Sequence, residues 1–122
     1  MTAQTTAPRG LRTPGKQLWA SVVGDYDLDQ HETALLVEAV RTVDLLTMLD
    51  EAVRKDGALI DSPQGVKAHP AAVEARQQRI ALARLLAALR LPAGGEDDRQ
   101  ANARPQRRAG VRGHYGVRGV VA

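Results

Sequence analysis

The segment from Asp29 to Gly57 constrains the fold most, because its apolar residues recur at three- and four-residue spacing over about seven helical turns. Glu32 follows Asp29 at the spacing of a capping box, which marks a helix N-terminus. Gly57 supplies the residue type that most often ends a helix. The sequence therefore predicts a long helix over residues 30–55, whose apolar side is formed by Leu35, Leu36, Ala39, Val40, Val43, Leu46, Leu49 and Val53. Leu45 and Met48 lie off this stripe and indicate a second contact.

A short helix is predicted before this segment. Thr13 has the character of an N-cap and Pro14 that of a first helical residue. The helix is expected to extend to about Val23, with Gly24 ending it.

A small β-hairpin and a last helix are predicted after the long helix. The run Ser62-Pro63-Gln64-Gly65 fits a type I turn, with proline second and glycine fourth, between the apolar residues Leu59-Ile60 and Val66. The dipeptide His69-Pro70 opens a helix that extends to about Arg90. The fold class is therefore all-α: a short N-terminal helix plus a long antiparallel helical hairpin with a small β-hairpin insertion.

The composition predicts self-association. The chain has no Phe, one Trp and no Cys, so its core is built from aliphatic side chains without disulfides. A folded part of about 80 residues buries a modest fraction of its surface and is marginal alone. The leucines of the last helix, within residues 80–91, are too many for two neighbouring helices to cover, so we expect subunit contacts. No apolar run approaches the roughly 18 residues of a membrane span, which favours a cytoplasmic protein.

Charge is sorted by region along the chain. Residues 17–92 carry eight basic and eleven acidic side chains, whereas both ends are basic. We divide the chain into a disordered basic arm (1–12), a helical domain (13–92) and a flexible Arg/Gly-rich tail (93–122). Basic ends on a slightly acidic body are typical of proteins that hold a polyanion, although polar tails also simply maintain solubility.

The basic residues are the candidate binding site. Arg76 and Arg79 lie one turn apart on the last helix, where they either contact phosphates or form surface ion pairs with residues such as Glu74. The tail resembles an Arg/Gly-rich nucleic-acid segment, but Tyr115 and Arg118 also suit a peptide that docks on a partner protein. The candidate DNA-contacting residues are Arg9, Arg12, Lys16, Arg76, Arg79, Arg104, Arg107, Arg108, Arg112 and Arg118.

No catalytic, metal or cofactor site is predicted. The run Asp25-x-Asp27-x-Asp29 resembles the start of a calcium loop, but Gln30 and Leu36 stand where that loop needs Gly and Glu. The three histidines are far apart, and His69 is interpreted as a cap residue. The chain has neither a phosphate-cradling loop nor an arguable nucleophile–base pair. The sequence therefore predicts a non-enzyme.

The body resembles the small subunit of phage terminases, in particular the P27 family. The resemblance covers roughly residues 14–92 and is carried by a series of short matches along the chain. These are Gln17-Leu18-Trp19, Tyr26-Asp27-Leu28, His31-Glu32, Ala34-Leu35-Leu36, Glu38-Ala39, Arg41-Thr42, Asp44, Leu49-Asp50, Ala52-Val53, Asp56-Gly57, Ser62-Pro63-Gln64-Gly65, His69-Pro70, Glu74-Ala75-Arg76-Gln77-Gln78 and Leu82-Ala83-Arg84-Leu85-Leu86.

The resemblance implies a ring-forming homo-oligomer of about eight to ten copies in the host cytoplasm. Such a subunit recognises double-stranded viral DNA at the packaging site and regulates the terminase large subunit, which holds the ATPase and nuclease. Two alternatives remain: a small DNA-binding regulator such as a repressor or antitoxin, and a structural adaptor without a DNA role.

Overall fold

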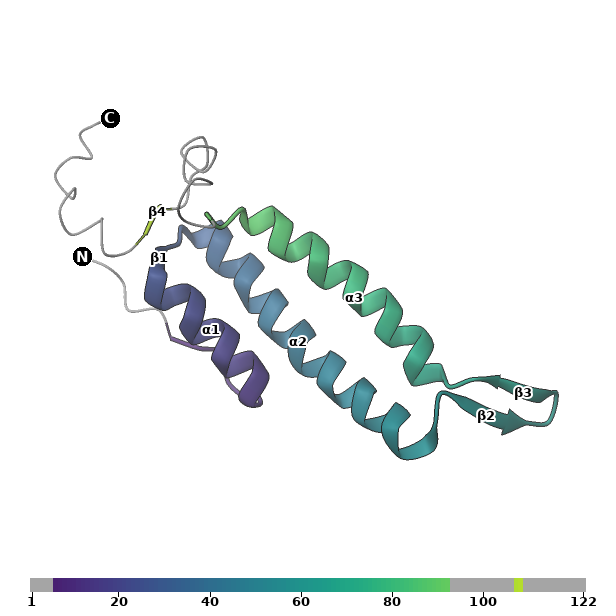
Figure 1. Cartoon of the computed structure of the whole chain (residues 1–122). Helices are drawn as coiled ribbons and strands as arrows, with labels where there is room; N and C mark the ends of the chain where they lie inside the picture. Colours follow the sequence, from purple (N-terminus) through teal and green to yellow (C-terminus); the bar gives the residue numbers. More distant parts are fainter. Residues whose placement is uncertain (1–5, 93–106, 109–122) are drawn as a thin grey trace, which may run out of the picture.

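A computed structural model describes residues 6–92 and 107–108 of the chain, and this part is mostly helical. Its elements in chain order are α1 (Thr13–Asp25), β1 (Tyr26–Asp27), α2 (Gln30–Asp56), β2 (Leu59–Ser62), β3 (Gly65–Ala68), α3 (Pro70–Leu89) and β4 (Arg107–Arg108). Helices α2 and α3 lie side by side and antiparallel, and the β2–β3 hairpin extends beyond their shared end (Figure 1). The predicted helical hairpin with its small β insertion is confirmed.

The ends of α2 follow the local signals of the sequence. At its start the capping box forms, and the Asp29 N–H donates to Glu32 Oε1 at 2.8 Å. At its end Gly57 has a φ of 89°, and its N–H donates to the Val53 carbonyl. Glycine adopts this left-handed backbone without a side-chain clash, so the helix ends within one residue of the predicted position.

The start of α1 differs from the prediction. Arg12, and not Thr13, is the N-cap residue, and its side chain forms no cap hydrogen bond. The Asp44 carboxylate of α2 accepts hydrogen bonds from the Arg12 and Gly15 backbone N–H groups instead. Helix α1 also continues through Gly24 to Asp25, because the turn begins only at the extended residue Tyr26.

The hairpin and the start of α3 form as predicted. Strands β2 and β3 pair antiparallel, with Leu59 opposite Ala68 and Ser62 opposite Gly65. His69 caps α3, because its Nδ1 accepts a hydrogen bond from the Ala71 N–H at 2.9 Å. The helix ends at Arg90, which adopts the left-handed conformation as the C-cap.

The core lies where α1, the first half of α2 and the end of α3 meet. Trp19 is 5% exposed and packs there, and it is joined by Leu11, Val22, Leu36, Val40 and Leu89. Leu11 belongs to the segment that the sequence assigns to the disordered arm. A single leucine among polar residues gives no periodic signal, so its packing was not predictable.

Parts of helices α2 and α3 are less covered than the core. Large apolar side chains are exposed on α2 and α3, including Met48, Val73 and Ile80 at 53%, 51% and 44%. On α3 only Ala75 and Leu89 are buried. The several-sided packing expected for its second half is therefore not formed within residues 6–92, and it stays a prediction about subunit contacts.

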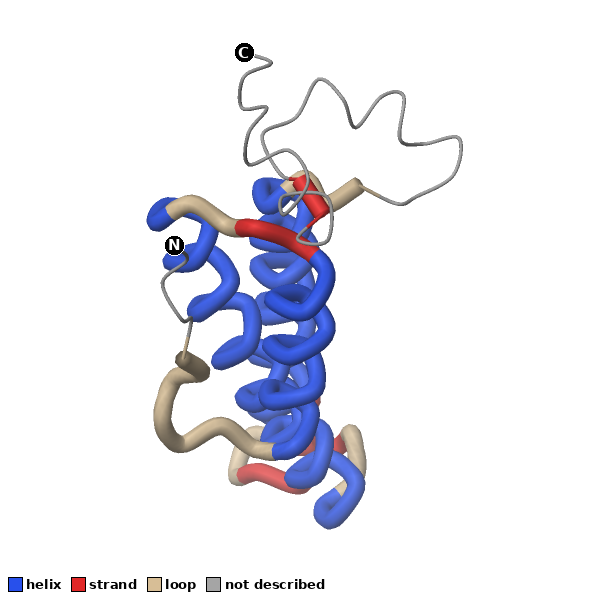
Figure 2. The backbone as a smooth tube through the Cα atoms, turned by 90° about the vertical axis from the view of Figure 1, so that its left-hand side faces the viewer, coloured by secondary structure: helices blue, strands red, loops and turns tan. Residues whose placement is uncertain are grey.

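The segment before α2 connects to the end of α3 and to a piece of the tail. The Tyr26 hydroxyl donates to the Pro92 carbonyl at 2.6 Å. Strand β1 pairs antiparallel with β4, so Tyr26 is opposite Arg108 and Asp27 is opposite Arg107. Figure 2 shows β1 and the β2–β3 hairpin at opposite ends of the helices. Within the described residues, none of the helices has the length and apolar character needed to cross a bilayer.

Candidate nucleic-acid interface

Most basic side chains of residues 6–92 are available to a ligand. Three of them form ion pairs with described residues: Arg12, Arg41 and Arg79. The others are exposed and form no ion pair with any residue of the described part of the chain. These are Arg9, Lys16, Arg54, Lys55, Lys67, Arg76, Arg84 and Arg90. An exposed guanidinium or ammonium group without an acidic neighbour meets a phosphate without first losing a protein partner.

Two of the predicted DNA-contacting residues have acidic partners on α2. Arg12 Nη2 donates to Glu51 at 3.1 Å, and Arg79 Nη2 donates to Asp50 at 2.8 Å. Adjacent helical residues point about 100° apart, so Glu51 reaches α1 while Asp50 reaches α3. The two pairs connect the C-terminal part of α2 to both of its neighbours, and all four side chains remain substantially exposed.

Arg76 and Arg79 therefore differ although they lie one turn apart. Arg76 is exposed and has no ion pair within the described residues, whereas Arg79 is engaged by Asp50. The alternative of an ion pair with Glu74 is not formed by either arginine, and Glu74 accepts a hydrogen bond from Gln78 instead. Arg76, together with the exposed Arg9 and Lys16, is the better candidate for direct phosphate contact.

The tail candidates are only partly described. Arg104, Arg112, Tyr115 and Arg118 lie outside the described residues. For Arg107 and Arg108 the structure gives the backbone alone, which places them beside β1. They are therefore near the acidic segment that precedes α2.

Three further exposed basic residues, Arg54, Lys55 and Lys67, are not among the candidates predicted from the sequence. All three are exposed at the hairpin end of the helical pair, near the start of α3. In the sequence the helix dipole is sufficient to explain Arg54 and Lys55, since cations are favourable in the last turn of a helix. Their position beside the predicted hairpin is the signal by which they could have been included among the candidate phosphate-contacting residues.

The opposite end of α2 has the reverse charge. Asp25, Asp27, Asp29 and Glu32 fall within eight residues that contain no Lys or Arg. Carboxylates repel DNA phosphates, so this end does not suit a recognition helix, whose N-terminal residues enter the major groove.

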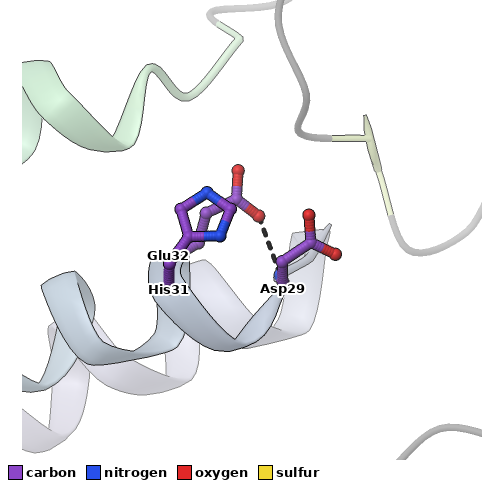
Figure 3. Close-up of side chains that lie close together, drawn as sticks. All are labelled: Asp29, His31 and Glu32. Carbon is purple, nitrogen blue, oxygen red and sulfur yellow. Dashed lines mark hydrogen bonds between the residues drawn. The ribbon is translucent and has the colours of Figure 1, made fainter.

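One group of side chains at this acidic end has the residue types of a metal site. Asp29, His31 and Glu32 each place one ligand-type atom within 4.8 Å of the others (Figure 3). Asp29 and His31 are exposed, whereas Glu32 is 2% exposed. In the sequence the capping-box spacing already explains Asp29 and Glu32, so no metal is predicted there.

Comparisons of the chain with known protein families, with curated protein sequences and with solved structures each found no match. The resemblance to terminase small subunits therefore rests on the residues quoted for it.

Proposed function

We propose that the protein is a non-catalytic DNA-binding subunit of a viral packaging machine, in the manner of a terminase small subunit. In this function it assembles into a ring, recognises double-stranded viral DNA at the packaging site and regulates a large subunit that holds the ATPase and nuclease. The observation that carries the proposal is the set of exposed basic side chains without acidic partners in residues 6–92, of which Arg76 is the most informative.

The distribution of charge favours contact along a surface over insertion of one helix. The cations without an ion pair among the described residues are spread over α1, the end of α2, the hairpin and α3, while a cluster of four acids within residues 25–32 lies around the start of α2. Each such cation supplies a weak, sequence-independent phosphate contact. Repetition of the contacts around an oligomer raises the total affinity through multivalency.

The apolar surface supports self-association. Met48 on α2 and Val73 and Ile80 on α3 are each more than 40% exposed. When a second subunit covers exposed apolar side chains, the burial stabilises the assembly by about 25 cal/mol per Å² of apolar area removed from water. The ring proposed here covers α3 with a neighbouring copy.

A salt titration of DNA binding tests the proposal. Affinity for a double-stranded fragment is measured by fluorescence anisotropy at several salt concentrations for the full-length protein and for Arg76→Gln. The variant should bind more weakly, and the slope of log K against log salt should fall by about 0.9 for each lost phosphate contact. Arg41→Gln is the matched control, because it removes the same charge from an arginine already paired with Glu38. If both variants bind like the native protein, Arg76 does not contact DNA.

The native mass tests the ring. Each chain has a mass of 13.1 kDa, and a single closed assembly of about eight to ten copies is expected by native mass spectrometry. A dimer that binds one discrete DNA sequence would favour a repressor or antitoxin-like regulator instead. Association that is insensitive to salt, with no retention on DNA, would favour a structural adaptor.

A further inference from the structure

The first turn of α2 places three side chains of ligand type on one side of the helix. Figure 3 shows the His31 ring beside the Glu32 carboxylate, with the Asp29 carboxylate next to them. One nitrogen of His31 and one oxygen from each carboxylate lie within 4.8 Å of one another. Two ligands of a tetrahedral zinc ion are about 3.4 Å apart at bond lengths of 2.0–2.2 Å. A small rotation of the exposed His31 ring, with an adjustment of the Asp29 carboxylate within its cap, would bring the three atoms to this spacing.

The Glu32 carboxylate has one oxygen that the helix cap does not use. Its Oε1 accepts the hydrogen bond from the Asp29 N–H, whereas Oε2 is buried and has no hydrogen-bond partner within the described residues. An ionised carboxylate oxygen that is both buried and unpaired is costly, and buried charges are normally paired or coordinate a metal. The capping box holds this oxygen in place, so a cation would meet a preorganised ligand.

The local charge also favours a cation. Residues 25–32 contain four carboxylates and no Lys or Arg. The N-terminus of a helix carries a partial positive charge of about half a unit, which opposes a cation. Two ionised carboxylates in the ligand set outweigh that partial charge.

We propose that Asp29, His31 and Glu32 form a binding site for a divalent cation of the zinc type. One imidazole nitrogen with two carboxylate oxygens suits Zn²⁺ and similar borderline transition ions, whereas Mg²⁺ and Ca²⁺ prefer oxygen ligands alone. Three protein ligands leave the remaining position to water. The site joins residues of the helix cap beside β1, so the bound ion would stabilise the start of α2. It does not depend on the proposed DNA-binding function.

Zinc titration of the tag-free, full-length protein tests the site. After treatment with a chelator, ZnCl2 is titrated by isothermal calorimetry, and CoCl2 is followed through its visible absorption bands. We expect one ion per chain, and no comparable binding of Mg²⁺. Loss of a metal ligand should weaken binding by more than the 10–100-fold typical of changes around the ligands. His31→Ala and Glu32→Gln should both show this loss.

The variants are chosen so that the fold survives. His31 is exposed, and Gln at position 32 retains the side-chain oxygen that accepts from the Asp29 N–H. Circular dichroism should therefore be unchanged without metal, while zinc should raise the Tm of the native protein and not that of Glu32→Gln. His114→Ala, which removes a histidine of the tail, should bind zinc like the native chain. Absence of stoichiometric binding, equal affinity in His31→Ala, or a loss of affinity in His114→Ala would each overturn the proposal.

Discussion

The Asp44 carboxylate of α2 caps α1 by accepting a hydrogen bond from the Gly15 backbone N–H at 2.8 Å. Its second oxygen accepts from the Arg12 N–H at 2.6 Å. Asp44 is 8% exposed, so both bonds are largely shielded from water. A carboxylate at this place also meets the positive end of the helix dipole. A single side chain thus satisfies the N–H groups of the N-cap residue and of Gly15 in α1, and fixes α1 against α2.

We expect Asp44→Ala to lower the free energy of unfolding by about 1–3 kcal/mol, because two N–H groups lose their acceptor in a partly buried place. Urea unfolding followed by Trp19 fluorescence measures the effect, since this buried residue is the one tryptophan of the chain. Asp61→Ala removes an exposed carboxylate of the hairpin and should change stability by less than about 0.5 kcal/mol. Equal unfolding midpoints for the two variants would contradict the capping role.

Two glycines of α1 should respond in opposite directions to alanine. A Cβ added at Gly15 would lie 2.6 Å from Asp44 Oδ2, whereas a Cβ at Gly24 meets nothing within 4 Å. Gly15→Ala must displace the cap, so we expect a loss of about 1–3 kcal/mol. Gly24→Ala should stabilise by up to about 1 kcal/mol, because alanine is the better helix former. The same urea assay compares the pair, and a gain of stability in Gly15→Ala would show that Asp44 moves without cost.

Most of the backbone was predictable because its signals are local. The bounds of α2 follow from the Asp29–Glu32 box and from Gly57, and the start of α3 follows from His69-Pro70. The start of α1 was not predictable in the same way. Its cap comes from Asp44, which is 29 residues away from Gly15, and a sequence does not show which distant carboxylate reaches a helix end.

The candidate site was predictable only as a set of charges. Residue types show that Arg76 and Arg79 are both basic and close in sequence, but the register of α2 against α3 decides which one meets an acid. That register brings Asp50 to Arg79 and leaves Arg76 unpaired within the described residues. The proximity of Asp29, His31 and Glu32 was not predictable for another reason: the capping box explains both carboxylates, so the sequence gives no sign of an unused oxygen.

His69 connects the end of α2 to the start of α3. Its Nδ1 accepts from the Ala71 N–H, and its Nε2 lies 2.9 Å from Asp56 Oδ2. We expect His69→Ala to cost about 1–2 kcal/mol, since the cap of α3 and the contact with Asp56 are both lost. His69→Asn retains an N-cap acceptor, but its shorter side chain does not reach Asp56. The decrease in the free energy of unfolding should therefore be smaller than for His69→Ala. Urea midpoints measure both, and identical losses would show that the cap contributes nothing.

A final prediction concerns the ion pair between Asp50 and Arg79, and it rests on the proposed DNA contact. Asp50→Asn removes the charge that holds Arg79 and should change stability by less than about 1 kcal/mol, because both side chains are exposed. The released guanidinium should strengthen DNA binding and steepen the salt dependence by up to about 0.9 per added phosphate contact.

Anisotropy titrations of the single variant and of Asp50→Asn combined with Arg79→Gln separate this effect from a change in net charge. The added affinity should disappear in the double variant, because the arginine that supplies it is gone. Glu38→Gln is the matched control, since it releases Arg41, which is not a candidate contact. An equal gain of affinity in Glu38→Gln would mean that the overall charge, and not Arg79, determines the binding.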